Sequence, residues 1–576
     1  MIKILKKLNI LLNKKQKSQM CILLFMMLIG AILEAASIAL IIPVITLVIS
    51  PDALAKNAYL QIISDFFNFR SQEQLTIFIM LMLVVAFILK NIYLYIQQKF
   101  LYSFIYTNQF DTSQLLMKNY ISKDYEYYLN ADTAVIQRNI TSDVNNMYAL
   151  ILAILTLVSE VIIFIALTSI LFVSDASMTL LMSAILIVTL LIIKKYLKPI
   201  LKKAGEDNQD FYSGLFKHIS QIVTGIKEIK VTGREYNFIN EYKKCGKGYV
   251  NAVQKYSLLN NVPRLLIETV FIIAIIIYMM IIVISKRPME EIMPILSAFA
   301  LSAARLMPCA NRINNQLNNM AYFEPFFMGI DDNLKNEIKT ASTDFDNSNI
   351  VKMPMNNSLE LQNITYAYPN TDKNILSNAN LTVKIGSSVG VIGTTGSGKS
   401  TLIDILLGLL NIKDGMILVD GVDIYSNYQS FVKNVGYIPQ MIFMLDDTIR
   451  RNVAFGISDK DINEDRIWEV LKEAQLDEFI KTLPNGLDTT IGERGIRLSG
   501  GQRQRIGIAR ALYHDPELLI LDEATSALDN DTESAIMDSI NNLHGRKTLI
   551  IIAHRLQTIE KCDVVYKVEN EKITKI

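Results

Sequence analysis

The chain has 576 residues, a net charge of +1 and a hydrophobic fraction of 51%. This charge balance shows no polyanion-binding character over the chain as a whole, so no nucleic-acid partner is expected. The cysteines lie too far apart for a metal site or a disulfide framework, at Cys21, Cys245, Cys309 and Cys562. Apolar runs crowd the first 325 residues, so we expect a membrane domain followed by a soluble domain.

Six apolar stretches are long enough to cross a bilayer, which takes about 20 mainly apolar residues. They are residues 20–49, 75–97, 134–173, 178–197, 265–285 and 292–320. No cleavable signal peptide is expected, because the first stretch is too long for one. Lysines before the first stretch, and a basic segment between the fourth and fifth, place both on the cytoplasmic side. Six spans would return the chain to the cytoplasm.

Three connections between these stretches have recognisable patterns. Residues 53–70 on the outer side carry apolar residues at helical spacing, which predicts a short amphipathic helix. That helix would lie either on the membrane surface or on the protein itself. On the cytoplasmic side, residues 124–130 and 225–234 are polar-aromatic or basic, and we expect them to contact the soluble domain.

Ionisable residues inside a membrane span are costly unless they are paired or hydrated. The predicted spans contain Glu34, Lys90, Glu160, Arg264, Glu268, Arg305 and Arg312. Lys90 and Arg305 lie about 24 and about 22 Å from the outer ends of their helices, and Arg312 follows Arg305 on the same face. Cations facing a cavity would suit an anionic head group such as phosphate, so Lys90, Arg305 and Arg312 are candidate substrate-binding residues. The alternative is that the carboxylates neutralise them internally.

A phosphate-binding loop of the form GxxxxGKS occupies residues 393–400, between an apolar strand and a helix. The backbone N–H groups of such a loop wrap the phosphates, Lys399 would reach the β- and γ-phosphates, and the Ser400 hydroxyl would bind Mg²⁺. The candidate nucleotide-binding residues here are Gly393, Thr394, Thr395, Gly396, Ser397, Gly398, Lys399, Ser400 and Thr401.

Two further segments complete the site. An apolar strand at 518–522 ends in Asp522, which would hold Mg²⁺, and the next residue, Glu523, would polarise the attacking water. A second anion site is expected where a helix begins after Leu498, at Ser499, Gly500, Gly501 and Gln502. One domain has no need of two such sites, which argues for a partner domain that supplies the second phosphate.

Together these residues resemble the ATP-binding cassette (ABC) family across 358–576, and residues 498–502 match its signature motif. The resemblance implies that Tyr368 stacks on adenine and that Gln440 contacts Mg²⁺ and responds to the membrane domain. It also implies that Asp529 belongs to the D-loop and that His554 contacts the γ-phosphate. Glu523, His554 and Gln440 are then the candidate catalytic residues, and Ser400, Gln440 and Asp522 the candidate Mg²⁺ ligands.

The fold class implied by this resemblance is an α-helical membrane domain of six transmembrane helices, of the type IV ABC exporter fold, followed by an α/β P-loop nucleotide-binding domain. We expect the membrane domain at 1–325, a linker at 326–356 and the ATP-binding domain at 357–576. The resemblance also implies a head-to-tail dimer with ATP between the two chains. Because no motif is degenerate, both sites should hydrolyse ATP, which favours a homodimer.

The membrane half resembles bacterial flippases for the lipid-linked oligosaccharides of protein N-glycosylation, and related polysaccharide exporters. The matching residues are 305–312, with Glu34, Lys90, Pro263, Arg264 and the outer segment 53–70. This resemblance implies ATP- and Mg²⁺-dependent flipping of a pyrophosphate-bearing oligosaccharide lipid across the bacterial cytoplasmic membrane, with membrane lipid as the other partner.

Two alternatives stay open. One is an exporter of drugs or of other lipids, such as a lipid A-like molecule, although a cavity for apolar drugs has little need of Lys90, Arg305 and Arg312. The other is a soluble ATPase or an ATP-gated channel. Six predicted spans oppose a soluble ATPase, and an intact Glu523 makes a channel unnecessary.

Overall fold

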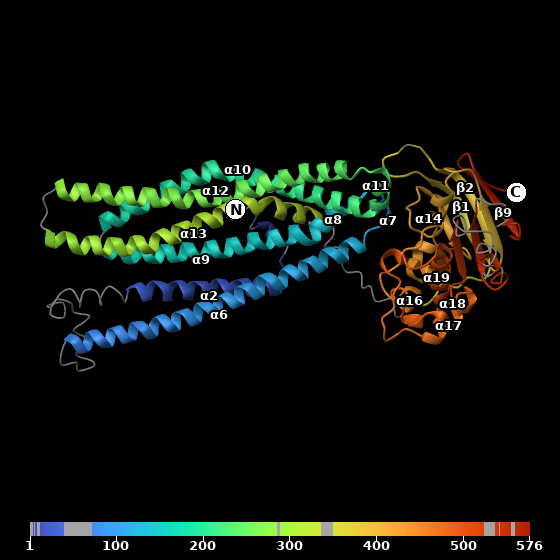
Figure 1. Ribbon diagram of the computed structural model, residues 1–576, viewed down its shortest axis with the longest axis horizontal. Coiled ribbons are helices and arrows are strands. Elements are labelled where there is room, and N and C mark those ends of the chain that lie inside the picture. The colour runs from blue at the N-terminus through green and yellow to red at the C-terminus, as the bar shows by residue number, and fades with distance from the viewer. Residues whose placement is uncertain are drawn as a thin grey trace. The chain divides into compact units, whose positions relative to one another are not determined.

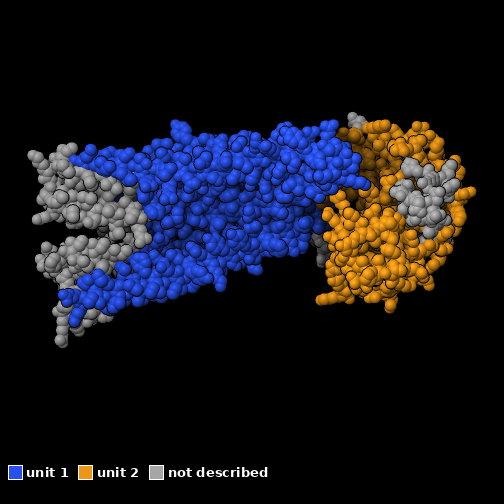
Figure 2. All heavy atoms as spheres, in the orientation of Figure 1, with its two compact units in different colours: residues 1–123, 131–343 blue, residues 124–130, 344–576 orange. Residues whose placement is uncertain are grey.

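The computed structural model describes residues 4, 6–8, 12–39, 72–174, 176–284, 289–335, 350–371, 373–523, 536–538, 540, 542–553 and 559–576. The chain divides into two compact units (Figure 2). Unit 1 comprises Met1–Lys123 and Ala131–Thr343, and unit 2 comprises Asp124–Asn130 and Asp344–Ile576. The short segment 124–130 thus belongs with the C-terminal part of the chain, although it lies in sequence between two parts of unit 1.

Unit 1 is helical, and its long helices run side by side (Figure 1). They are α2 (Lys14–Ala39), α6 (Gln72–Ile121), α9 (Val144–Ser174), α10 (Ala176–Thr224), α12 (Glu235–Ile284) and α13 (Met289–Lys335). Shorter elements are α8 (Thr133–Arg138), the π-helix η1 (Asn139–Asp143) and α11 (Ile226–Thr232). A helix of 50 residues, such as α6, is about 75 Å long and exceeds the roughly 30 Å hydrocarbon core of a bilayer.

Each predicted span overlaps one long helix of unit 1. Among the residues that the structure describes, three helical segments are long and apolar enough to cross a membrane: Lys14–Glu34, Glu73–Ile121 and Thr133–Ser169. The number of six spans therefore stays a prediction. The predicted outer helix at 53–70 lies outside the described residues.

The interior of unit 1 is built around α9 and α13. Leu150 and Leu155 of α9, and Cys309 and Ala310 of α13, are all within 2% of full burial and belong to one apolar cluster. Leu23 of α2 joins this cluster and is also fully buried. Because α13 has buried residues on several faces, it is the helix around which its neighbours pack.

Unit 2 contains two β-sheets. The four-stranded sheet is antiparallel, in the order β2-β1-β4-β5, from β1 (Ser358–Tyr366), β2 (Leu376–Lys384), β4 (Asp414–Val419) and β5 (Val422–Asp423). The six-stranded sheet has the order β10-β9-β3-β8-β7-β6, from β3 (Ser388–Ile392), β6 (Val435–Ile438), β7 (Leu518–Asp522), β8 (Thr548–Ile552), β9 (Val564–Glu569) and β10 (Lys572–Lys575). Strands β6, β7, β8, β3 and β9 pair in parallel. Their carboxyl ends therefore meet at one edge, where ligands bind in such sheets.

Unit 2 also contains seven helices among the described residues. They are α7 (Tyr125–Asn130), α14 (Lys399–Leu406), α15 (Tyr428–Val432), α16 (Ile449–Val453), α17 (Glu464–Glu473), α18 (Asp477–Thr482) and α19 (Gly500–Tyr513), with short 3₁₀ turns η2 (Ile424–Asn427), η3 (Gly486–Asp488) and η4 (Glu493–Gly495). Helix α14 is buried along most of its length, with Leu402 and Ile405 fully enclosed. A buried α14 holds the loop that precedes it against the sheet.

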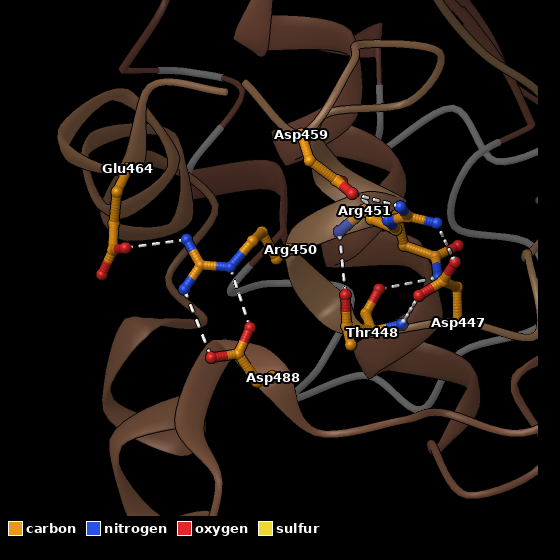
Figure 3. Close-up of polar contacts among 8 residues, drawn as sticks. Asp447, Thr448, Arg450, Arg451, Asp459, Glu464 and Asp488 are labelled. Atoms are coloured by element: carbon orange, nitrogen blue, oxygen red, sulfur yellow. Dashed lines mark hydrogen bonds and ion pairs between the residues drawn. The ribbon is translucent and has the colours of Figure 1, made fainter. Parts of the chain in front are cut away.

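Two arginines fix α16, which follows Gln440 in the chain (Figure 3). Arg450 lies 2.7 Å from Glu464 at the start of α17 and 2.8 Å from Asp488 in η3. Arg451 lies 3.0 Å from Asp447, one turn earlier. The carboxylates of Glu464, Asp488 and Asp447 are 54%, 65% and 30% exposed, so solvent weakens each pair and each stabilises little by itself. Together they hold the segment after Gln440 against the neighbouring helices.

Candidate functional site

The loop 393–398 joins β3 to α14, as the sequence predicts. Gly396 and Gly398 have φ of 82° and 100°, a left-handed conformation that favours glycine. The Lys399 ammonium turns back over the loop and donates to the carbonyl oxygens of Gly393, at 2.9 Å, and Thr394, at 3.1 Å. Lysine and loop therefore already have the arrangement of a phosphate cradle.

Position 393 has room only for glycine. A Cβ there would lie 2.5 Å from Ser397 Oγ and 2.5 Å from the carbonyl oxygen of Val568. The Ser397 hydroxyl is buried and has no hydrogen-bond partner among the described residues. A buried hydroxyl normally has a hydrogen-bond partner, and an anion bound in this narrow glycine loop would supply one.

The carboxyl end of β7 places two acids beside the loop. Glu523 accepts a hydrogen bond from Gln440 Nε2 at 2.8 Å. The Tyr437 hydroxyl bonds to Asp522, and the charge of Lys399 acts on the same carboxylate. Burial, and then the nearby Glu523 carboxylate, raise the pKa of Asp522 above its usual range. The structure thus brings together Lys399, Gln440, Asp522 and Glu523.

Asp404, on α14, is a third acid near this site. Burial and the charge of Asp522 raise its pKa from 3.8 to about 6. Asp404 was not predicted from the sequence, although an acid on the helix that packs behind the phosphate-binding loop is a signal for it. Burial, and then the repulsion between neighbouring carboxylates, disfavour the ionised forms of Asp404 and Asp522.

Oxygen donors are the ligands that Mg²⁺ prefers, and the predicted ligands supply a hydroxyl, an amide oxygen and a carboxylate. These are Ser400, Gln440 and Asp522. The neighbouring carboxylates of Asp404 and Glu523 add negative charge that fits a divalent cation. Among the described residues no cluster of histidine, cysteine and acidic side chains offers a metal site of its own.

Tyr368 lies against the helix that follows the loop. Its hydroxyl is 2.9 Å from Thr401 Oγ1, and its ring makes an edge contact with Tyr366 at a centroid distance of 5.3 Å. This position beside the loop is compatible with stacking on adenine, which stays a prediction. Asp529 and His554 lie outside the described residues, and their roles stay predictions too.

The signature segment forms the start of α19. The backbone N–H of Gln502 donates to Ser499 Oγ at 3.2 Å, and that of Ser499 donates to Gln502 Oε1 at 2.8 Å. This reciprocal pair is a capping box. Within the described part of the chain, no hydrogen bond joins residues 499–502 to the loop 393–398. The two predicted anion sites of one chain are therefore separate.

Helix α7 is anchored in unit 2 by Glu126. Its carboxylate accepts hydrogen bonds from the Asn411 backbone N–H at 2.9 Å, from Asn411 Nδ2 at 3.3 Å and from the Tyr366 hydroxyl at 3.3 Å. The expectation that 124–130 contacts the soluble domain is thus met. The other expected segment, 225–234, contains α11 and belongs to unit 1. Glu126 itself was not predicted from the sequence, in which it is one of two carboxylates in this polar-aromatic segment.

The candidate substrate residues lie in unit 1. Lys90 is 8% exposed, with Nζ 4.4 Å from the centre of the Phe87 ring, a cation–π contact. Arg312 Nε lies 2.6 Å from Glu160 Oε1 on α9, and the two side chains are 45% and 10% exposed. Arg305 is on α13, but its side chain lies outside the described residues. Internal pairing, left open by the sequence, is thus observed for Arg312, and the substrate roles stay predictions.

Comparison with protein families decides what this architecture is. Residues 24–301 match the ABC transporter transmembrane region, and residues 376–526 match the ABC transporter domain. The chain belongs to the ABC transporter family. The family confirms the predicted fold, a helical transmembrane region followed by an ATP-binding domain, and the prediction of a transport ATPase at the level of the family. The domain limits stay predictions.

Several relatives of this ABC transporter are bacterial. It is 35% identical over 355 residues to the heterocyst differentiation ATP-binding protein HepA of Nostoc sp., covering 61% of this chain and 57% of that protein. It is 34% identical over 281 residues to the ATP-dependent lipid A-core flippase of Pseudoalteromonas translucida, and the match covers 48% of this chain and 47% of the flippase. It is 42% identical over 213 residues to the ATP-dependent lipid A-core flippase of Escherichia coli, and the match covers 37% of this chain and 36% of the flippase. The matches thus span between about a third and rather more than half of these relatives' length.

A solved structure supports the fold over the whole chain. This ABC transporter is similar to a bacterial Atm1-family ABC exporter with ATP bound, with a TM-score of 0.70 and 21% identity. The match covers 97% of this chain and 95% of that chain. At this identity the likeness shows the fold.

Proposed function

We propose that this ABC transporter hydrolyses ATP as a homodimer and uses the energy to flip a lipid-linked, pyrophosphate-bearing oligosaccharide across the bacterial cytoplasmic membrane. The observation that carries the substrate class is Arg312, an ionised side chain on a membrane helix that stays 45% exposed although it is paired with Glu160. A half-exposed guanidinium on such a helix can bind a further anionic group, such as a phosphate, besides its carboxylate partner.

In the ATPase step, Lys399 exchanges its bonds to loop carbonyls for bonds to phosphate oxygens, and the loop N–H groups bind the remaining oxygens. Glu523, held by Gln440 at 2.8 Å, accepts a hydrogen bond from the attacking water and orients it. Mg²⁺, held by Ser400, Gln440 and Asp522, would neutralise charge on the β- and γ-phosphates. His554 would contact the γ-phosphate.

The dimer follows from the separation of the two anion sites. Residues 393–400 of one chain and residues 499–502 of the other would enclose one ATP, so that ATP favours the closed dimer and hydrolysis releases it. Helix α7, anchored through Glu126, would carry that movement to the transmembrane helices on either side of it in sequence.

The substrate follows from charge. A guanidinium matches the oxygens of a phosphate, and Arg305 and Lys90 would add further positive charge along the same path. An apolar drug gives these cations nothing to bind. A lipid A-like substrate is the second candidate, because two of the relatives are lipid A-core flippases.

The test is reconstitution of the full chain in liposomes with a labelled undecaprenyl-pyrophosphate oligosaccharide. We expect ATP-dependent loss of label accessibility, and a loss of at least about tenfold in rate for Arg305→Ala/Arg312→Ala, which corresponds to about 1.4 kcal/mol. Unchanged flipping in this variant would remove the phosphate contact. Flipping of a lipid A-like molecule in place of the oligosaccharide lipid would favour the second candidate.

A further inference from the structure

Directly after Arg312, α13 carries a run of amide side chains that the sequence analysis did not use. They are Asn314, Asn315, Gln316, Asn318 and Asn319, with Asn311 just before Arg312. Five amides within six residues of one helix are unusual where none of them is fully exposed, since each carries both a donor and an acceptor that need partners. The inference drawn from them rests on the proposed function.

One part of the run shares a face with Arg312. Asn315, Gln316 and Asn319 lie three, four and seven residues after Arg312, so they line up along one side of the helix. All three are half-buried. Asn319 Nδ2 donates to Gln316 Oε1 at 3.3 Å, and the Tyr256 hydroxyl of α12 donates to Asn319 Oδ1 at 2.7 Å. Along this face of α13 the charged Arg312 is therefore followed by three neutral amide side chains.

The other part is buried and lacks partners. Asn314 and Asn318 are 2% and 4% exposed, and the Nδ2 atom of each has no hydrogen-bond acceptor in the part of the chain that the structure describes. The Oδ1 atoms of Asn311 and Asn315 likewise have no hydrogen-bond donor among the described residues. A buried amide without a partner costs free energy, so this packing leaves binding capacity that another state of the protein can use.

The position of the run along the helix indicates which part of a lipid it would meet. Arg312 is about 35 Å from the start of α13 at Met289, given 1.5 Å per residue. The hydrocarbon core is roughly 30 Å thick. If α13 enters from the outer side, as the lysine distribution predicts, Arg312 lies near the cytoplasmic boundary and the amides lie beyond it. A lipid pyrophosphate sits at such a boundary with its sugars in the water.

We propose that the amides of α13 from Asn314 to Asn319 bind sugar hydroxyl groups of the substrate on the cytoplasmic side, while Arg312 binds its phosphate. A hydroxyl both donates and accepts, as an amide does, so the two classes match without any charge. Asn315, Gln316 and Asn319 meet the sugar first. Asn314 and Asn318 gain partners when α13 separates from its neighbours, so sugar binding favours the open arrangement.

The experiment compares two substrates in liposomes that contain the full chain: undecaprenyl pyrophosphate with one sugar, and the same lipid with an oligosaccharide. The first variant is Asn314→Leu/Asn318→Leu. We expect it to flip the oligosaccharide lipid at least about tenfold more slowly and the one-sugar lipid within about twofold of the unchanged protein. Because leucine removes two buried Nδ2 groups that have no acceptor among the described residues, we also expect a higher melting temperature, which a purely structural role for these amides would not give.

A second variant, Asn315→Ala, tests the half-buried face without touching the core, and it should show the same selective loss. The matched control is Asn261→Leu, since Asn261 is an exposed amide on α12 that donates to the Ser257 carbonyl oxygen at 3.0 Å. Equal loss on both lipids, or no loss on either, would overturn the sugar site and leave the proposed function standing. Failure of the unchanged protein on both lipids would overturn the proposed function and the sugar site together.

Discussion

The Glu126 carboxylate accepts a hydrogen bond from the Asn411 backbone N–H at 2.9 Å, although the two residues are 285 positions apart in sequence. Asn411 follows the helix that carries Lys399, and Glu126 belongs to a six-residue helix between two segments of the membrane domain. Because the same carboxylate also bonds to Tyr366, the partner of the Tyr368 ring, α7 is joined to the surroundings of the nucleotide site through one side chain.

Replacing Glu126 by alanine should uncouple transport from ATP hydrolysis. The change removes the acceptor of three hydrogen bonds at a partly buried site, a loss of about 1–3 kcal/mol. We expect ATP affinity within about twofold of the unchanged protein and at least about tenfold less lipid flipped per ATP hydrolysed. Both quantities are measured in the same liposomes. Glu241→Ala is the control, because Glu241 is exposed and pairs with the nearby Lys244. A normal ratio in Glu126→Ala would exclude this role for α7.

Glu523→Gln should abolish turnover and keep ATP binding. Glutamine keeps the shape of the side chain and loses the carboxylate that orients water, so we expect the ATPase rate to fall by about 10² or more. Binding of a fluorescent ATP analogue should change little. An ATPase rate close to that of the unchanged protein would remove Glu523 from the mechanism.

Two variants distinguish a structural role of the Arg312–Glu160 pair from binding of the substrate by Arg312. Arg312→Ala leaves the Glu160 carboxylate, 10% exposed, without its partner, and should lower the unfolding free energy by up to about 3 kcal/mol. Arg312→Met/Glu160→Gln removes both charges and should restore the melting temperature. Flipping should stay lost in the double variant if the guanidinium binds phosphate. Recovery of flipping together with stability would show that the arginine is purely structural.

Asp404 predicts a pH dependence of stability. Its pKa is raised to about 6 in the folded chain from 3.8, so the folded state binds the proton more tightly. Ionised Asp404 then destabilises the fold: the penalty is absent below about pH 4, grows as the pH rises, and is complete above about pH 6. Asp404→Asn should therefore be the more stable protein at pH 7.5, by roughly 1–3 kcal/mol, and the difference should shrink at pH 5.

Melting curves without nucleotide or Mg²⁺ at the two pH values measure this effect. Asp465→Asn, on the exposed side of α17, is the control and should leave the melting temperature unchanged at both. A difference between Asp404→Asn and the unchanged protein that is constant with pH would mean that packing, and not charge, is responsible.

Local pattern was enough to predict much of this structure. Long apolar stretches mark the helices of unit 1, because a helix satisfies all its backbone hydrogen bonds within one continuous segment of chain. The loop at Gly393 and the acids after β7 were predictable because their chemistry depends on neighbours in sequence, namely a strand before the loop and a strand before the acids. These signals depend on only a few neighbouring residues, so they do not depend on how the rest of the chain packs.

Side-chain pairing between distant elements was not predictable in the same way. Helical periodicity indicates which face is buried, but it does not indicate which turn of a second helix meets that face. Arg312 and Glu160 are 152 residues apart, and the sequence suggested a pairing without selecting it over substrate binding. The burial of Asp404 beside Asp522 depends on how α14 packs on the sheet, which one helix cannot reveal by itself.

The capping box between Ser499 and Gln502 has a kinetic consequence. Two backbone N–H groups at the start of α19 already have acceptors within the chain, so this turn holds its shape before any phosphate arrives. A partner cassette would then meet a preorganised surface and incur little loss of conformational entropy in binding it. The rate at which two such surfaces associate would be set by how the chains approach each other and not by local folding. This suits a dimer that would close and reopen with each ATP hydrolysed.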